Sequence, residues 1–280
     1  LPSGTEFAMH DKILLITAAC YLFATILLYV AVAERSTTKR RLAAGLTLLG
    51  LFMHMWAQSQ HWVIPTSPQV SLLNILSLCA LVTVAIPLIS YPARNSLFDA
   101  SLVALPLSVL ILIAEGTLSA PALEITHTTG HMTAHIFTSV IAFGVLSIAG
   151  VYALFISLID HLLRQHQVNR LVQTLPALDK LEALLFYLIK IGLAVLTISL
   201  LTGLVYVDDL FGQHLAHKTI LSIFAWLVFA LLLWGRWKRG WRGRVAVRMT
   251  LAGIALLLLS YFGSKLVLEI ILERSWHLQG

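Results

Sequence analysis

Two histidines, His54 and His135, lie inside strongly apolar segments of this chain. An imidazole surrounded by hydrocarbon needs a partner, and ionisable groups inside membrane segments mark functional sites by default. Two neutral imidazoles can hold a haem iron from its opposite faces, with the second nitrogen of each ring bonded to a neighbouring group. Alternatively, hydroxyl or carbonyl groups on adjacent helices satisfy each ring, and the histidines are structural.

A second histidine pattern favours a different metal. His127, His131 and His135 have i, i+4, i+8 spacing, which on a continuous helix places three rings on one face. His214 and His217 could join them from another external loop, and such a cluster could bind zinc or copper. The threonines and the glycine around His131 weaken this alternative, because they interrupt a helical pattern.

The common soluble-enzyme motifs are absent from the sequence. It has no Walker loop, no GxSxG and no HExxH, and its two cysteines, Cys20 and Cys79, form neither CxxC nor CxxCH. These absences argue against thiol chemistry and covalent haem attachment. They favour binding or transfer over catalysis, although they leave an enzymatic role open.

Composition assigns the chain to the polytopic membrane proteins. Hydrophobic residues make up 59% of the sequence and charged residues 11%, and the mean hydropathy is +0.88. We therefore predict an all-α protein, a single bundle of eight transmembrane helices joined by short loops. The predicted spans are Ile13–Ala33, Leu42–Gln58, Val70–Tyr91, Leu97–Ala114, Met132–Leu158, Leu181–Val207, Ile220–Trp237 and Val245–Leu272. Residues 1–8 resemble an expression scar before Met9, so residues 9–280 form the predicted single domain.

Basic residues predict the orientation of these helices. One set of alternate loops carries fourteen lysines and arginines, and the opposite set carries three. The positive-inside rule then places both termini in the periplasm and the basic loops in the cytoplasm. The excess of positive charge therefore reflects topology and the lipid bilayer, and it requires no nucleic-acid partner. With this orientation, His54 and His135 each lie about one turn inside the outer membrane surface, at matched depth.

Two segments near the C-terminus resemble a known family. Lys218–Arg244 reads KTILSIFAWLVFALLLWGRWKRGWRGR, and it is followed by Ser260-Tyr261-Phe262-Gly263. With Leu181-Glu182, Thr202–Tyr206 and the region of His135, these residues are similar to cytochrome c assembly proteins of the CcsA/CcmC haem-handling type. Leu72-Leu73-Asn74 and a histidine in the second helix are similar to the short, eight-helix YpjD-like branch. The resemblance implies a helical membrane fold and an association with haem.

The chain departs from the family pattern at two places. The tryptophan-rich external segment, WGxxWxWD, has no counterpart at residues 208–214, which read DDLFGQH. His135 fits the position of the family's first external histidine. The position expected for the second one is occupied by Leu272. We therefore expect His54 to take the opposite axial position.

Together these features predict an integral membrane protein of the bacterial inner membrane that binds haem b non-covalently. His54 and His135 would hold the iron in the outer membrane half, and Lys265 would pair with a propionate. The expected role is carriage, storage or delivery of haem to an acceptor or a cytochrome assembly partner. Two alternatives remain open: a membrane electron-transfer subunit whose fixed haem reacts with quinol, and a haem-free accessory subunit of a transporter.

Overall fold

The computed structural model shows a helical bundle. It describes residues 4–62, 69–70, 72–91, 98–118, 123–124, 130–165, 178–206 and 216–263. Side chains are described for residues 12–60, 73–91, 98–118, 134–165, 178–205 and 218–261.

Eight α-helices account for nearly all of the described chain. They are α1 (Gly4–Ala33), α2 (Thr37–Trp62), α3 (Leu72–Ser90), α5 (Ser101–Thr117), α6 (Gly130–Arg164), α8 (Leu178–Tyr206), α9 (Ala216–Arg239) and α10 (Arg244–Leu258). A π-helical turn, η1 (Leu259–Gly263), continues α10. Two short strands, β1 (Gln69–Val70) and β2 (Leu123–Glu124), pair antiparallel, with Gln69 opposite Glu124. The prediction of an all-helical protein is confirmed, apart from this two-residue pairing.

Six of the helices are long and apolar enough to cross a membrane: α1, α3, α6, α8, α9 and α10. Helix α5 is apolar but has only 17 residues, and α2 begins with the basic residues Lys39, Arg40 and Arg41. The chain is thus a multi-pass membrane protein. That α2 and α5 also cross the bilayer, and that both termini are periplasmic, stay predictions.

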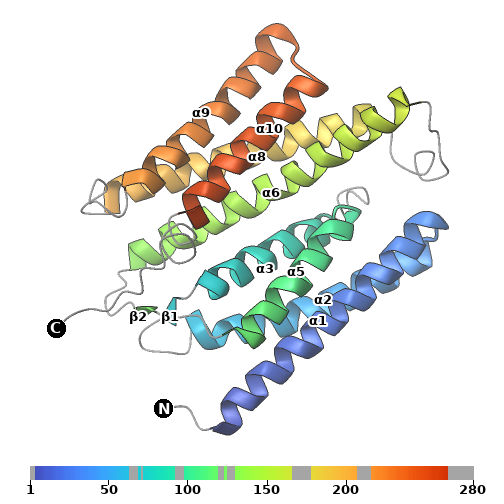
Figure 1. Cartoon of the computed structure of the whole chain (residues 1–280), viewed down its shortest axis with the longest axis vertical. Helices are drawn as coiled ribbons and strands as arrows, with labels where there is room; N and C mark the ends of the chain where they lie inside the picture. Colours follow the sequence, from blue (N-terminus) through green and yellow to red (C-terminus); the bar gives the residue numbers. More distant parts are fainter. Residues whose placement is uncertain are drawn as a thin grey trace.

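The helices form two groups that meet at α3 and α6 (Figure 1). Helices α1, α2, α3 and α5 pack together around Tyr21, Val84 and Leu105. The other core joins α6, α8, α9 and α10, and it also includes Leu78 and Cys79 of α3. Helix α3 therefore contributes to both cores and connects the two groups.

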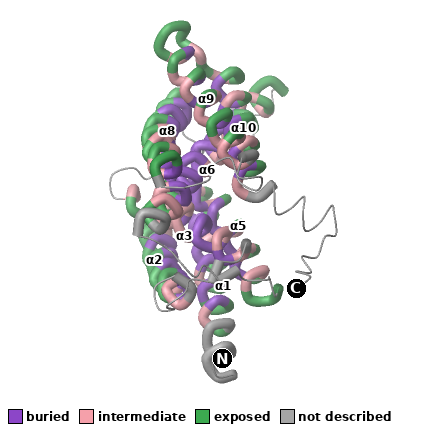
Figure 2. The backbone as a smooth tube through the Cα atoms, turned by 90° about the vertical axis from the view of Figure 1, so that its left-hand side faces the viewer, coloured by how far each residue is buried: buried purple, intermediate pink, exposed green. Residues whose placement is uncertain are grey.

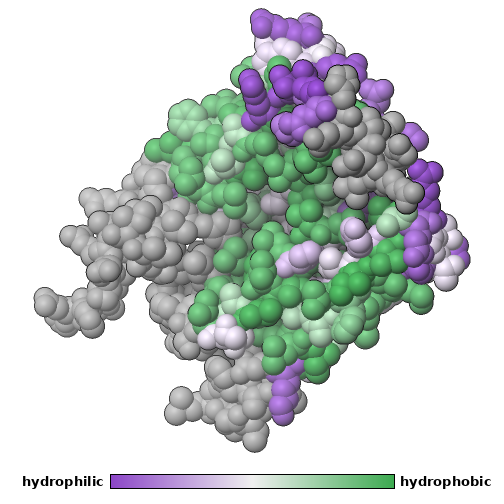
Figure 3. All heavy atoms as spheres, turned by 45° about the vertical axis from the view of Figure 1, so that its right-hand side comes forward, coloured by the Kyte–Doolittle hydropathy of each residue, from purple (hydrophilic) through white to green (hydrophobic). Residues whose placement is uncertain are grey.

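Apolar side chains cover the outside of the bundle as well as its inside. Phe23, Ile89, Leu110 and Val205 are all more than half exposed. Figure 2 shows buried residues along the centre of the molecule, and Figure 3 shows a broad apolar surface with hydrophilic residues gathered at its edges. An apolar exterior of this kind matches the hydrocarbon core of a bilayer.

Ion pairs connect the ends of helices that lie next to the basic loops. Arg40 of α2 lies 3.0 Å from Asp99, which precedes α5. Arg244, at the start of α10, lies 3.1 Å from Asp160 near the end of α6. These contacts agree with the predicted topology, which assigns the loops α1–α2, α3–α5, α6–α8 and α9–α10 to one side.

The turn between α9 and α10 explains the Gly-Trp-Arg-Gly motif. Gly240 and Gly243 both have positive φ, 65° and 57°, and the ψ of Gly243 is −128°, a conformation essentially restricted to glycine. The Gly243 N–H donates to Oε1 of the buried Glu182 on α8, at 2.8 Å. The motif shared with the family is thus a turn fastened to α8, and these contacts give it a structural role.

Replacement of Gly243 tests this role. Gly243→Ala should lower the free energy of unfolding by about 1–3 kcal/mol, because a Cβ is strained at this φ and ψ. Gly45→Ala in α2 is the matched control, since no atom lies within 4 Å of the added Cβ and alanine is the better helix former. Denaturant titration of the purified protein measures both. Equal stability of the two variants would contradict the strained turn.

Candidate functional site

His135 lies on α6 with its ring directed toward α8. Its Nδ1 lies 2.9 Å from the backbone oxygen of Ser199 and 3.2 Å from the hydroxyl of Thr202. A carbonyl oxygen only accepts, so Nδ1 carries the proton and donates it to Ser199. In the neutral ring, Nε2 then holds a lone pair. Among the described residues, no atom forms a hydrogen bond with Nε2. This is the arrangement by which proteins prepare a histidine as a metal ligand.

A small residue on α8 allows the ring to approach. A Cβ at Gly203 would lie 2.8 Å from Cε1 of His135, closer than a real Cβ contact. One turn deeper, the hydroxyls of Ser139 on α6 and Ser199 on α8 lie 2.6 Å apart. Small residues and hydroxyl pairs of this type bring membrane helices into close contact. The position of His135 therefore depends on the sequence of α8.

Two aromatic residues from the segments that resemble the family, Tyr261 and Trp226, form hydrogen bonds with α6 and α8. The hydroxyl of Tyr261, in the π-helical turn, donates to the backbone oxygen of Ser139 at 3.1 Å. Its ring lies 5.3 Å from that of Phe143 on α6. From α9, the Trp226 indole donates to Thr197 of α8 at 2.8 Å. π-Helical turns occur often at functional sites, and here the turn aligns Tyr261 with the helix that carries His135.

His54 has different surroundings. It is completely buried, and both of its ring nitrogens have hydrogen-bond partners. Nδ1 lies 3.3 Å from the Tyr21 hydroxyl of α1, and Nε2 lies 2.9 Å from the Ser77 hydroxyl of α3. In this conformation neither nitrogen is available to a metal.

The sequence analysis left open that hydroxyl groups on adjacent helices satisfy the ring of His54, but it did not identify the residues of this polar network. Gln58 donates to Ser77 at 2.7 Å and lies 3.4 Å from Glu115 of α5. The i, i+4 spacing of His54 and Gln58 on α2 was a signal that could have revealed a shared polar face. The partners on α1, α3 and α5 had no such signal, since only the packing brings them to the same place.

The structure places His54 and His135 in different helix pairs. His54 faces α1 and α3, whereas His135 faces α8, and α3 lies between α2 and α6 in both ribbon views (Figures 1 and 2). No described contact joins the two residues. The side chains of Lys265 and of the alternative ligands His127, His131, His214 and His217 lie outside the described residues. Among the side chains that are described, no group of three His, Cys, Asp or Glu residues could hold a metal.

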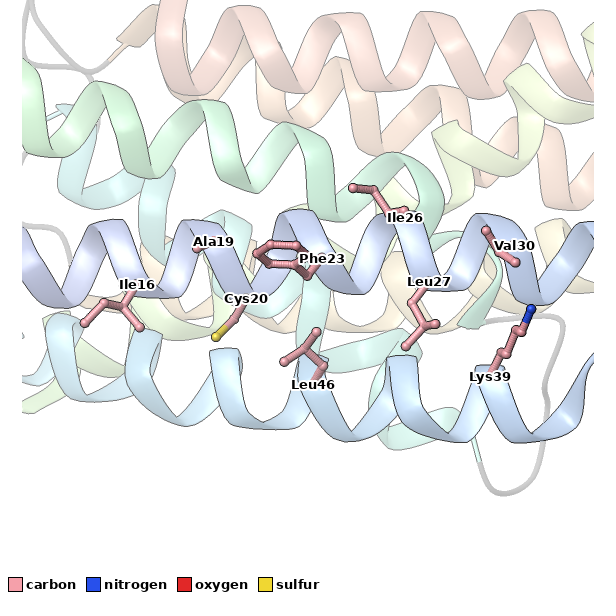
Figure 4. A pocket seen from close by; sticks show the side chains of 9 residues that line it. All are labelled: Ile16, Ala19, Cys20, Phe23, Ile26, Leu27, Val30, Lys39 and Leu46. Atoms are coloured by element: carbon pink, nitrogen blue, oxygen red, sulfur yellow. The ribbon is translucent and has the colours of Figure 1, made fainter.

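A pocket of about 580 Å³ has neither histidine in its lining. It is a groove between α1 and α2, lined by Ile16, Cys20, Phe23, Leu27 and Leu46, with Lys39 at one end (Figure 4). Its lining is almost wholly apolar, so it offers the surroundings of a lipid chain.

The sequence model of the family described as "Cytochrome C assembly protein" matches residues 2–272. The chain belongs to this family of cytochrome c assembly membrane proteins, which confirms the resemblance inferred from its motifs.

Curated relatives agree with this assignment. The chain is 40% identical to "Inner membrane protein YpjD" of Escherichia coli K12 over 149 residues, 52% of this chain and 56% of that protein. It is 34% identical to "Uncharacterized 28.8 kDa protein in nifR3-like 5'region" of Azospirillum brasilense over 140 residues, 49% and 52% of the two chains. It is 30% identical to "Cytochrome c biogenesis protein CcsA" of Prochlorococcus marinus strain MIT 9303 over 91 residues, 32% and 29%. The chain therefore spans about half the length, or less, of these relatives, and no solved structure matches it.

The two histidines differ in burial, so their replacement by alanine should lower the free energy of unfolding by different amounts. His54→Ala should destabilise the protein by about 2–4 kcal/mol, because it leaves a cavity and an unpaired Tyr21 hydroxyl. His135→Ala should cost about 1 kcal/mol, since the ring is half-buried and the Ser199 oxygen keeps its bond from Thr202. Thermal unfolding of the protein purified without added ligand measures both. Equal losses would show that the two sites are packed alike.

Proposed function

We propose that this protein binds haem b non-covalently in the outer half of the bacterial inner membrane and takes part in haem handling for cytochrome assembly. The observation that carries the proposal is the geometry of His135. Its Nδ1 is hydrogen-bonded to a backbone carbonyl of α8, which directs the lone pair to Nε2. Membership of the cytochrome c assembly family makes haem the ligand that best fits a histidine prepared in this way.

The residues around His135 fit a histidine that would hold haem. When bound, haem supplies an iron that accepts an imidazole nitrogen. Ser199 and Thr202 hold the ring in one orientation, and the missing side chain of Gly203 leaves room for the ring against α8. The hydrogen bonds that Nδ1 donates also make Nε2 a stronger electron-pair donor to a metal. These groups bind and orient, so the proposed role is carriage or transfer.

As the second residue that would hold the haem we propose His54, on the basis of its predicted depth. In the described conformation it must first give up its bond to Tyr21 or to Ser77. The His135 part of the proposal thus has direct geometric support, and the His54 part depends on a rearrangement of α2 against α3. Lys265, near the outer end of the last predicted helix, is the proposed partner of a propionate.

The missing tryptophan segment bears on what happens to the haem. A protein that presents haem to a soluble acceptor needs an exposed aromatic surface, and residues 208–214 contain no tryptophan. We therefore propose that the haem stays among the helices until a membrane partner receives it.

An absorption spectrum of the purified protein tests the proposal. The wild-type protein should show the Soret and α bands of a low-spin b-type haem, and His135→Ala should lose them, because the iron loses its nitrogen ligand. His161→Ala, at the opposite end of α6, is the matched control and should keep the spectrum. His54→Ala should lose the low-spin signature if His54 is the second ligand. Wild-type bands in His135→Ala would overturn the proposal, whereas wild-type bands in His54→Ala alone would remove only the second ligand.

Thr202 and Gly203, which lie next to the His135 ring, should affect the affinity for haem but should not be required for binding. Thr202→Val and Gly203→Ala should weaken haem affinity by about 10–100-fold, the usual effect of changing groups that orient a metal ligand. The spectral type should be retained, since the imidazole is still present. Haem titration of the apoprotein measures the affinity, with Gly45→Ala as the control. Unchanged affinity in both variants would show that α8 does not position the ligand.

A further inference from the structure

A polar pocket of about 350 Å³ lies at the end of the bundle opposite the histidine site, where α6, α8 and α10 meet. Its charged lining comes from the last turns of α6, with Asp160, His161 and Arg164, and from the start of α10, with Arg244 and Arg248. Three arginines face one carboxylate, so the pocket carries net positive charge. It therefore suits an anion.

Asp160 fixes two of the three arginines. Its carboxylate lies 3.0 Å from Nε of Arg164 and 3.1 Å from Nε of Arg244, while both arginine side chains stay more than half exposed. Nε is the bonded nitrogen in each pair, so the terminal nitrogens are left to meet a ligand. Arginine recognises phosphate with such nitrogens, often two at a time.

Arg248 has no such partner. It lies one turn beyond Arg244 on α10, lines the same pocket and is exposed. Among the described residues no carboxylate pairs with it. A guanidinium that lines a pocket without a counter-ion is the group that a bound anion would neutralise.

The lining of the pocket also includes apolar residues, namely Ile156, Leu178 and Val247. Leu158 and Val245, close by in sequence, are 47% and 43% exposed, as expected for side chains that face lipid. The pocket therefore lies beside side chains that face lipid, and on the predicted topology it lies at the inner surface of the membrane. Anionic phospholipids are concentrated there, and basic pockets between helices bind their headgroups.

The geometry points to a binding site for the phosphate group of an anionic phospholipid, formed by Arg164, Arg244 and Arg248 and separate from the histidine site. This site is a defined pocket, distinct from the general attraction of basic loops to the bilayer. Its ligand chemistry, a phosphate ester, is shared with soluble phosphates, but its position beside lipid-facing side chains at the predicted inner surface favours the lipid.

Lipid titration of the full-length, delipidated protein in detergent tests the site. Native mass spectrometry should show one phosphatidylglycerol retained at concentrations where phosphatidylcholine is lost. Arg248→Gln should weaken phosphatidylglycerol binding about fivefold, the factor that corresponds to roughly 1 kcal/mol per basic residue near an anionic surface. Arg41→Gln, an exposed basic residue on the same predicted side but outside the pocket, is the control and should bind as the wild type does.

Other results would overturn the proposed lipid site. Equal weakening by Arg248→Gln and Arg41→Gln would show diffuse surface charge and overturn the site. Displacement of the lipid by an equal concentration of glycerol phosphate would identify a soluble phosphate ester as the ligand and overturn the lipid assignment. If Arg248→Gln does not fold, Arg164→Gln replaces it, and unchanged affinity in that variant overturns the site. None of these outcomes depends on haem.

Discussion

The close contact between α6 and α8 is the constraint on which the candidate site depends. Gly203 and Gly192 both lie where an added Cβ would overlap a side chain of α6, His135 and Leu146 respectively. Between them, Ser199 bonds Ser139 across the interface. Because the backbones approach so closely, a carbonyl of α8 reaches the imidazole of α6. Without this contact His135 would have no fixed orientation and no assigned lone pair.

Buried His54 and half-buried His135 show how one residue type takes different roles in an apolar environment. His54 has a hydroxyl partner at each nitrogen, so the protein itself satisfies the ring. His135 has partners at Nδ1 only, which leaves Nε2 for a ligand. This difference in partners is why the proposed function rests on His135 first and on His54 second.

The family motifs have mainly structural explanations. Gly240 and Gly243 shape the turn before α10, and Glu182 accepts the Gly243 N–H from across the interface with α8. Tyr261 bonds the backbone of α6 through the π-helical turn. These contacts hold α8 and α10 against α6, so the residues that carry the family resemblance belong to the frame that positions His135. The N-terminal helices meet this frame through α3.

The sequence alone determined the helical membrane class, the approximate positions of most helices and the family, because apolar runs and basic loops are local signals that need no partner. It also singled out His54 and His135, since a polar side chain within such a run is visible without a structure. Tertiary packing decided what each histidine contacts. The partners of His54 come from α1 and α3, and those of His135 come from α8, 64 and 67 residues away. Matched depth in two helices did not imply contact, because depth is a property of each helix alone, whereas the direction of a side chain depends on how the helices pack.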